Sequence, residues 1–323
     1  MTQSELGSQL KLFSLSSNQE LAEKIASVVG VPLGKCSVKQ FSDGELQINI
    51  EESVRGDEVY IVQGTSYPVN DNLLELLIMI DALKRASAKT INIVMPYFGY
   101  ARQDRTAKPR EPITAKLVAD LIEKAGATRL LTLDLHTVQL QGFFDIPVDN
   151  LFTMPLFEEH YLAKDLMGEN IVVVSPKNSG VGRARVLAKY LDASLAIVDQ
   201  CSNDESERES YVIGNVENKT CIVVDDIINT GHTLAVAADV LKAAGAKDIY
   251  ACASHGLFNG DAASILAKAP FKQISVTDSI KLPETVDLPN LEIITCSRLM
   301  GDAVNRIYKN IAMSPLFGYH NKS

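Results

Sequence analysis

Residues 223–233 read Val-Val-Asp-Asp-Ile-Ile-Asn-Thr-Gly-His-Thr, and this stretch decides the predicted fold. The apolar run from Cys221 to Val224 predicts a buried strand that ends in two adjacent carboxylates. A turn follows, and a helical pattern begins at Leu234. Backbone N–H groups of such a turn can hold a phosphate at the helix N-terminus, and the carboxylates can accept hydrogen bonds from sugar hydroxyls. The stretch therefore predicts a strand–turn–helix unit that binds a phosphorylated sugar.

Single residues of the turn have separate expected roles. The hydroxyls of Thr230 and Thr233 add hydrogen-bond donors, and Gly231 lets a ligand approach the backbone closely. The alternative is an ordinary strand-to-helix turn after an acidic strand end, and the spacing is compatible with both. The expected sugar-phosphate residues are Asp225, Asp226, Asn229, Thr230, Gly231, His232 and Thr233.

Short apolar runs alternate with helical patterns along the rest of the chain. The predicted strands are 59–63, 91–95, 130–133, 171–174, 195–198, 221–224, 249–253 and 274–276. The predicted helices are 71–86, 113–124, 181–191 and 234–244. This alternation predicts an α/β fold whose mostly parallel sheets are flanked by helices. Because the pattern occurs twice, we expect two similar domains, 1–150 and 151–323, with the C-terminal segment able to pack back on the first.

Composition narrows the class of protein. The 323 residues fit two domains, and a hydrophobic content of 46% suits a globular core. A net charge of −9 argues against nucleic acid or an anionic membrane as the main partner. The first residues show no secretory pattern, and no apolar run approaches the roughly 20 residues that span a bilayer. The five cysteines are widely spaced and form no zinc pattern, so we expect free thiols in a reducing cytoplasm.

Further motifs identify a family. Residues 41–45 read Phe-Ser-Asp-Gly-Glu, and residues 97–105 read Tyr-Phe-Gly-Tyr-Ala-Arg-Gln-Asp-Arg. Residues 110–116, 134–136 and 141–148 carry three more motifs, Arg-Glu-Pro-Ile-Thr-Ala-Lys, Asp-Leu-His and Gln-Gly-Phe-Phe-Asp-Ile-Pro-Val. Together with the first stretch they resemble the ribose-phosphate diphosphokinase (ribose-phosphate pyrophosphokinase, PRPP synthase) family, in family order, from about residue 11 to 317.

The resemblance implies a fold and a reaction. The implied fold is two phosphoribosyltransferase-type domains with the active site between them. In the implied reaction, O1 of ribose 5-phosphate attacks the β-phosphorus of ATP, and PRPP and AMP form for nucleotide biosynthesis. Such a transfer depends on positioning and on cations around the polyphosphate. The resemblance also implies Mg²⁺ as cofactor and a homohexamer with an allosteric ADP and phosphate site; residues 141–148 and 314–317 resemble contact regions.

The nucleotide side is also implied by the resemblance. Phe41 is expected to stack on adenine, and the alternative is a core aromatic, which its polar neighbours disfavour. Arg102 can bind phosphate oxygens in a fork geometry, and the alternative is a solvated surface residue. His136 is expected near the ATP phosphates and the metal ion. The expected ATP-binding residues are Phe41, Asp43, Gly44, Glu45, Arg102 and Gln103.

Three departures from the family pattern bear on catalysis. Lys177 stands where the family has a magnesium-associated aspartate, and it can serve as a fixed positive charge in part. Asn229 stands where the family usually has aspartate. Residues 200–202, Gln-Cys-Ser, replace a Lys/Arg-rich run that follows the position of Asp199. Removing one preorganised electrostatic donor costs about 10²–10³ in rate, so these changes predict slow catalysis.

The stretch 200–210 has four acidic residues and a single cation, Arg208, and we expect a mobile acidic loop. Arg208, or a cation from a neighbouring subunit, is the candidate substitute for the missing charges.

Three functional hypotheses remain. The first is a ribose-phosphate diphosphokinase, with activity that the altered loop puts in question. The second is a non-catalytic paralogue that binds nucleotide and ribose phosphate, joins an oligomer with an active relative and regulates it. The third, a PRPP-using phosphoribosyltransferase, is weakest, because such an enzyme needs no ATP site at Phe41 and Arg102. Measuring AMP and PRPP production separates the first two.

Overall fold

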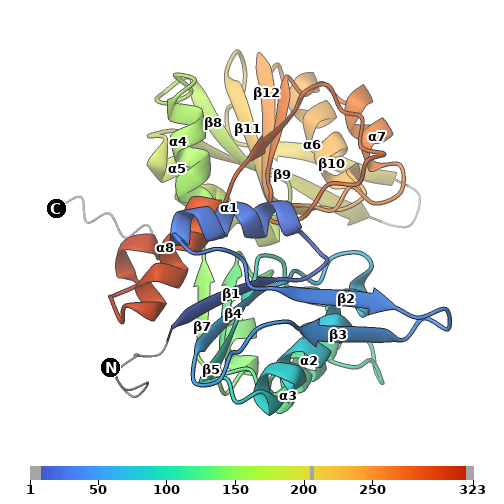
Figure 1. The fold of residues 1–323 in the computed structure, drawn as a ribbon. Coiled ribbons are helices and arrows are strands. Elements are labelled where there is room, and N and C mark those ends of the chain that lie inside the picture. The colour runs from blue at the N-terminus through green and yellow to red at the C-terminus, as the bar shows by residue number, and fades with distance from the viewer. Residues whose placement is uncertain (1–8, 204–206, 318–323) are drawn as a thin grey trace. The chain divides into compact units, whose positions relative to one another are not determined.

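The computed structural model describes residues 9–203 and 207–317, with the side chains at 200–209 left out (Figure 1). These residues form two compact units. The first extends to Phe152 and takes up the chain again from Cys296, whereas the second is Thr153–Thr295. The C-terminal helix therefore belongs to the same unit as the N-terminal strands.

The first unit has a five-stranded parallel sheet in the order β1-β4-β5-β6-β7, and a separate antiparallel hairpin, β2–β3 (Figure 1). Its strands are β1 (Leu10–Ser14), β2 (Cys36–Gln40), β3 (Leu46–Ile50), β4 (Glu58–Val62), β5 (Thr90–Met95), β6 (Arg129–Leu133) and β7 (Val148–Leu151). Its helices are α1 (Gln19–Val29), α2 (Val69–Arg85), α3 (Thr114–Ala125), α8 (Ser297–Tyr308) and the 3₁₀ turns η1 (Val138–Phe143) and η3 (Ser314–Phe317).

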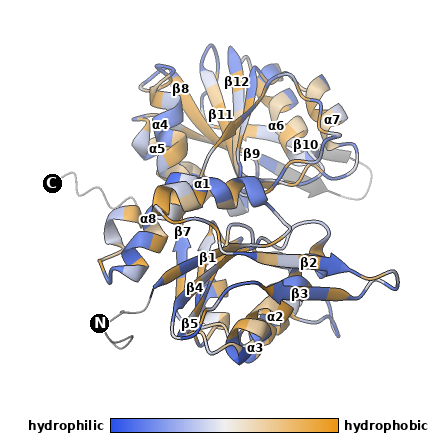
Figure 2. Cartoon of the chain, in the orientation of Figure 1, coloured by the Kyte–Doolittle hydropathy of each residue, from blue (hydrophilic) through white to orange (hydrophobic). Residues whose placement is uncertain are grey.

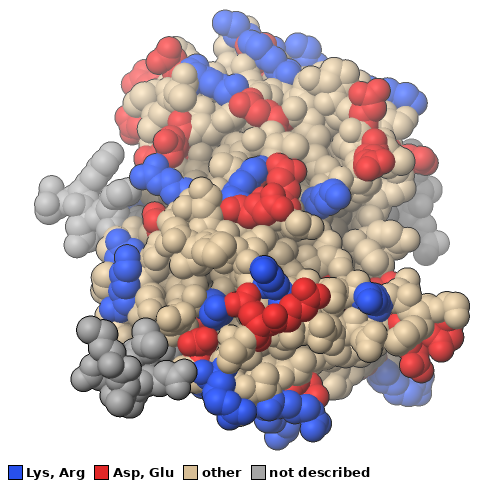
Figure 3. All heavy atoms as spheres, viewed as in Figure 1, with Lys and Arg blue, Asp and Glu red and all other residues tan. Residues whose placement is uncertain are grey.

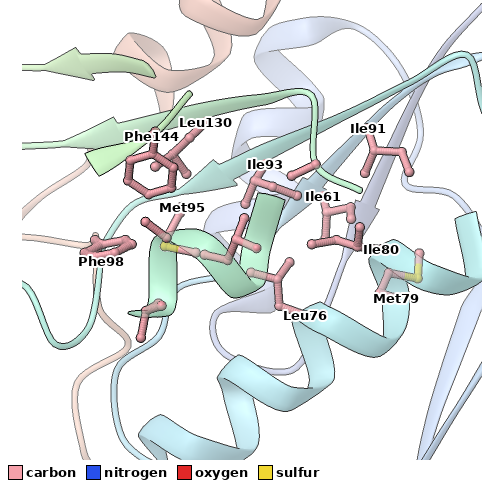
Figure 4. Close-up of a cluster of buried hydrophobic side chains, with 14 of the residues drawn as sticks. Ile61, Leu76, Met79, Ile80, Ile91, Ile93, Met95, Phe98, Leu130 and Phe144 are labelled. Atoms are coloured by element: carbon pink, nitrogen blue, oxygen red, sulfur yellow. The ribbon is translucent and has the colours of Figure 1, made fainter. Parts of the chain in front are cut away.

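Strand alternation places the core of this unit. Alternate residues of a strand point to opposite faces, and Ile61 and Ile93 join the cluster that α2 and α3 cover (Figure 4). Phe98 and Phe144 close one end of that cluster edge to face, with ring centroids 5.8 Å apart. Helix α8 packs on α1 so closely that a Cβ at Gly301 would lie 2.6 Å from Val28 Cγ1.

The second unit has a seven-stranded sheet in the order β10-β9-β8-β11-β12-β13-β14. Its strands are β8 (Ile171–Ser175), β9 (Ser194–Asn203), β10 (Glu207–Ile213), β11 (Thr220–Ile228), β12 (Asp248–Gly256), β13 (Gln273–Thr277) and β14 (Leu291–Ile294). The pairing is parallel except between β9 and β10. Its helices are α4 (Met154–Leu162), α5 (Val181–Tyr190), α6 (His232–Ala243), α7 (Ala262–Lys268) and the 3₁₀ turn η2 (Asn178–Gly180).

Helices cover both faces of this sheet. Val173 and Val224 pack with α4 and α5, whereas Val172 and Val223 pack with α6 and α7. Buried strands of this kind are apolar on both sides, and Figure 2 shows that hydrophobic colour along β8 and β11. The predicted α/β fold with mostly parallel, helix-flanked sheets is therefore confirmed.

All eight predicted strands and all four predicted helices are present, with ends that shift by a few residues. The elements that were not predicted include β1, α1 and the β2–β3 hairpin. One prediction was wrong: residues 200–203 and 207–210 are not loop but parts of β9 and β10, which pair antiparallel. Residues 204–206 lie outside the described residues. Val198 of β9 and Val212 of β10 lie opposite each other and pack toward the core, which stabilises the hairpin.

The surface shown in Figure 3 mixes positive and negative side chains, in keeping with the modest net charge of −9. Four cysteines (Cys36, Cys221, Cys252 and Cys296) are free thiols, as predicted, and Cys201 lies outside the described side chains. Within the described residues, every helix falls short of the length and apolar character that a membrane crossing requires.

Candidate active site

The sugar-phosphate stretch folds as predicted, as strand β11 followed by helix α6. Gly231 is the N-cap residue of α6, and within the described residues no side-chain cap hydrogen bond forms there. The first N–H groups of an uncapped helix are available to an anion, and the helix dipole favours negative charge there. Thr230, His232 and Thr233 are exposed around this N-terminus. The turn therefore has the donors that a phosphate needs.

Two residues of the turn, Gly231 and Asn229, have structural roles. Gly231 has φ +78°, and a Cβ there would lie 3.0 Å from Leu266 Cγ of α7, so both conformation and packing require glycine. Asn229 accepts a hydrogen bond at Oδ1 from the side-chain amide of Asn259, 2.7 Å away. The Asn259 N–H donates to the Asn229 carbonyl at 2.8 Å. These contacts tie the turn to the segment after β12.

The two carboxylates before the turn are buried and lie beside two cations. Asp225 and Asp226 are each 2% exposed. Lys177 Nζ lies 3.0 Å from Asp225 Oδ2 and 3.9 Å from Asp226 Oδ1. Arg183 Nη1 lies 3.7 Å from Asp225 Oδ1 and 3.6 Å from Asp226 Oδ1. Buried carboxylates need such partners, because leaving water is costly for a charge.

Burial raises the pKa of Asp225 to about 6, and the adjacent Asp226 carboxyl adds to the increase. Lys177 acts in the opposite direction but does not offset these causes. The Asp226 N–H also donates to Asp225 Oδ1 at 2.9 Å. A carboxyl with this pKa gains a proton in mildly acidic solution, so the charge of the pair depends on pH.

Lys177 is held by the turn between β8 and α5. Ser175 Oγ donates to the Lys177 carbonyl at 2.7 Å, and the Gly180 N–H donates to the same oxygen at 3.1 Å. A Cβ at Gly180 would lie 2.8 Å from Ser175 Oγ, so the turn is too tight for a larger residue. The backbone of Lys177 is thus fixed, and its side chain remains 37% exposed.

The β9–β10 hairpin is connected to the same turn through Asp199. The Asn178 side-chain amide donates to Asp199 Oδ1 at 2.8 Å, and Tyr211 Oη donates to Asp199 Oδ2 at 3.2 Å. Arg208 belongs to β10, but its side chain lies outside the described residues, and its proposed catalytic role stays a prediction.

In the first unit, the predicted adenine-binding residues form the tip of the β2–β3 hairpin. The Phe41 N–H donates to the Glu45 carbonyl at 2.8 Å, and the Gly44 N–H donates to the Phe41 carbonyl at 2.9 Å. Asp43 Oδ1 accepts from the Glu45 N–H at 3.1 Å, and Gly44 has φ +95°. Phe41 is 50% exposed, so its ring is accessible to a base.

Two other predicted segments of this unit are joined by a hydrogen bond. Thr137 Oγ1, next to His136, donates to Asp104 Oδ2 at 2.8 Å. Arg102 and Gln103 are exposed and precede α3, where Thr114 Oγ1 donates to Gln103 Oε1 at 2.6 Å. The segments follow the carboxyl ends of the neighbouring strands β5 and β6, where ligands bind in open α/β sheets.

The donor set does not fit a resident divalent cation. Mg²⁺ prefers several oxygen ligands, yet the Asp225–Asp226 pair already contacts an ammonium and a guanidinium. Across the described residues, no group of three or more His, Cys, Asp or Glu side chains is arranged to hold a metal ion. His136 alone is a poor Mg²⁺ site, because a hard cation prefers oxygen.

Sequence reasoning missed Arg183 in the first turn of α5. A signal was present, because the helix dipole disfavours a cation near a helix N-terminus. An arginine at that place indicates an anionic partner, which the structure shows to be the Asp225–Asp226 pair.

Sequence comparison finds two matching family descriptions. Residues 10–126 match the N-terminal domain of ribose phosphate pyrophosphokinase, and residues 203–318 match the phosphoribosyl synthetase-associated domain. A protein of Enterococcus faecalis named "Putative ribose-phosphate pyrophosphokinase 1" is 64% identical over 317 residues, which cover 98% of each chain. A Streptococcus agalactiae protein named "Putative ribose-phosphate pyrophosphokinase 2" is 61% identical over 97% of this chain and 96% of its own.

Among solved structures, phosphoribosylpyrophosphate synthetase from Mycobacterium smegmatis is similar, with a TM-score of 0.87 and 38% identity. The match covers 94% of this chain and 99% of that one.

Proposed function

The chain belongs to the ribose-phosphate pyrophosphokinase (PRPP synthase) family, a family of transferases, and on that basis we propose how it handles its substrates. The ribose 5-phosphate binds at the β11–α6 turn, ATP binds through the β2–β3 hairpin and the Arg102 segment, and the diphosphoryl group moves to O1 of the sugar. The observation that carries the proposal is the uncapped α6 N-terminus beside the buried Asp225–Asp226 pair.

The sugar site combines two kinds of recognition. The N–H groups at the start of α6, with Thr230 and Thr233, bind the 5-phosphate. Asp225 and Asp226 accept hydrogen bonds from the ribose hydroxyls, as carboxylates do. His232 is exposed at the same turn and adds a donor. Asn229 supports the site by holding the turn to Asn259.

The nucleotide site uses an aromatic ring and a cation. Phe41 stacks on adenine, with Asp43, Gly44 and Glu45 forming the hairpin tip beside it. Arg102 and Gln103 contact the phosphates, and His136 approaches them from the end of β6. Mg²⁺ enters with ATP as the metal–nucleotide substrate, because the residues that the structure describes do not form a site for a resident ion.

We expect slow turnover. The protein holds both substrates, but residues 200–202 offer no cation for the transferring group. Binding without matching stabilisation of the transition state gives ordinary affinities and a low rate constant. The alternative is a non-catalytic paralogue that regulates an active relative. The lack of cations at residues 200–202 favours this alternative as well.

We also propose a cytoplasmic homo-oligomer larger than a dimer, able to mix with an active paralogue. Support comes from an apolar stripe formed by Ile113, the N-cap residue of α3, and by Leu117 and Leu121 of that helix, which are 41%, 56% and 41% exposed. Unpaired apolar faces of this kind often mark interaction sites. Light scattering at micromolar concentration tests the assembly, and a monomer contradicts it.

The direct test uses purified protein with Mg²⁺, ATP and ribose 5-phosphate. Production of AMP and PRPP in equal amounts supports the transferase. Binding of both substrates without any product over hours, in protein that remains folded, supports the regulatory alternative.

A further inference from the structure

Asp225 and Asp226 form a buried double negative charge that needs a counter-charge. Each residue is 2% exposed, and the two carboxyls are consecutive at the end of β11. In a poorly solvated site, two neighbouring carboxylates repel each other strongly unless cations lie close. Many proteins meet this need with a divalent ion, whose two positive charges match the pair.

Here the chain supplies the same amount of charge from its own side chains. Lys177 Nζ contacts Asp225 at 3.0 Å, and Arg183 lies 3.6–3.7 Å from both carboxyls. The contact distance makes Lys177 the closer partner. One ammonium and one guanidinium together carry the charge of one divalent ion, so a metal would compete with them for the same oxygens.

The position of Lys177 is fixed before any ligand binds. Its carbonyl accepts hydrogen bonds from Ser175 and Gly180, and the tight Gly180 turn leaves little freedom for the backbone. An ammonium has three N–H donors, and this side chain is 37% exposed. The group can therefore hold Asp225 and still present a donor to a bound anion.

We propose that Lys177, assisted by Arg183, is a built-in cation that takes the place of a divalent metal ion at the Asp225–Asp226 pair. The ribose-phosphate unit then binds its sugar phosphate without metal. The second statement rests on the proposed sugar site, whereas the first concerns the charge pair alone. Lys177 acts as a positioning residue, because it orients the two carboxylates that accept from the sugar.

The first statement is tested by titrating the full chain with Mn²⁺ in the absence of nucleotide. The electron paramagnetic resonance signal of free Mn²⁺ reports how much of the ion is bound. Wild-type protein should bind Mn²⁺ weakly. Lys177→Asp should bind one Mn²⁺ per chain at least about tenfold more tightly, because the exchange changes the local charge by two units. Adding Asp225→Asn and Asp226→Asn to that variant should remove the gained site, which places the ion at the pair.

Two conservative variants separate charge from packing. Lys177→Arg keeps a cation and should retain the wild-type thermal midpoint and weak Mn²⁺ binding. Lys177→Met keeps the apolar stem without the charge, and it should lower the midpoint in EDTA and regain part of the loss with Mn²⁺. Circular dichroism confirms that each variant is folded.

Two results would overturn the proposal. One is a wild-type chain that binds one Mn²⁺ tightly and loses it in Asp225→Asn with Asp226→Asn. The other is a folded Lys177→Asp variant with no gain in Mn²⁺ affinity.

The second statement, that the sugar phosphate binds without metal, is tested by the thermal shift that ribose 5-phosphate produces in wild-type protein. Equal shifts in EDTA and in Mg²⁺ support it, and a shift that requires Mg²⁺ contradicts it. Absence of any shift rejects the proposed sugar site, while the Mn²⁺ titration still decides the role of Lys177.

Discussion

The β11–α6 turn lies in the same unit as η2 and the β9–β10 hairpin, the two segments that we propose to face the transferring group. The two regions depend on the fold in different ways. The turn is built from backbone geometry and packing, as the φ of Gly231 and its contact with Leu266 show. The altered cation positions are single side chains, and residues 200–202 belong to a strand that forms with Gln-Cys-Ser in place of cations. The fold can therefore keep the proposed binding turn while the charges proposed to assist catalysis change.

The largest expected effect is a dependence of stability on pH, which arises from the buried Asp225–Asp226 pair. The pKa of Asp225 is raised to about 6 in the folded protein, against 3.8 for an ordinary aspartate. The folded state therefore binds more protons than the unfolded state between these values, and stability from this group is lost as pH rises from about 4 to about 6. The loss amounts to roughly 3 kcal/mol at about 1.4 kcal/mol per pKa unit.

The measurement is the thermal midpoint of wild-type protein and of Asp225→Asn at pH 4, 5 and 6.5. The midpoint of the wild type, relative to that of the variant, should fall as pH rises. Asp239→Asn, at an exposed position of α6, is the matched control and should follow the wild type. A difference that stays constant across the three pH values would contradict the account of the pair.

The second prediction concerns the binding turn. Ribose 5-phosphate at a hundredfold excess over its dissociation constant should stabilise the protein by about 2.7 kcal/mol through ligand linkage. Asp225→Ala combined with Thr230→Ala should abolish that stabilisation, because it removes a hydroxyl acceptor and a phosphate donor. Thr285→Ala, at an exposed threonine outside the turn, should leave it unchanged. An undiminished thermal shift in the double variant places the sugar elsewhere.

The sequence predicted these two regions unequally, for physical reasons. Strand β11 and helix α6 follow from the apolar run and the helical period, which are local signals. The contact between Lys177 and Asp225 joins residues 48 positions apart, so no local pattern reports it. The position of Arg183 in the first turn of α5 gives a weak local indication of an anionic partner, because the helix dipole disfavours a cation there. Residues 200–203 and 207–210 form strands where the sequence predicts a loop, because their charged residues hide the alternation that pairs β9 with β10.

The third prediction concerns the proposed adenine-binding residue, Phe41. Stacking of a base on an aromatic ring contributes about 1–3 kcal/mol in nucleic-acid sites, and we expect a similar contribution from the half-exposed Phe41. Phe41→Ala should weaken ATP binding in calorimetry by about 5–150-fold, whereas Phe41→Tyr, which keeps the ring, should bind nearly as well as the wild type. Equal ATP affinity of wild type and Phe41→Ala would exclude the stacking role.

The smallest expected effect concerns the missing cations. Replacing Gln200 with Lys, Cys201 and Ser202 with Arg, and Lys177 with Asp should raise kcat by at least about tenfold, equivalent to about 1.4 kcal/mol. The gain should appear in kcat more than in KM, because these groups act on charge that develops during transfer. Thr285→Arg adds the same net charge at an exposed position and should leave kcat unchanged.

The central claim is that substrate binding is retained while catalytic charge is lost. Its most direct test is the steady-state rate of AMP formation, measured for wild-type protein and for this four-residue variant. The account predicts an ATP KM that differs little between the two, a wild-type kcat well below the 1–100 s⁻¹ that is typical of kinases, and a rise of at least about tenfold in the variant. A wild-type kcat already within that range, or a folded variant whose rate is no higher than the wild-type rate, would contradict it.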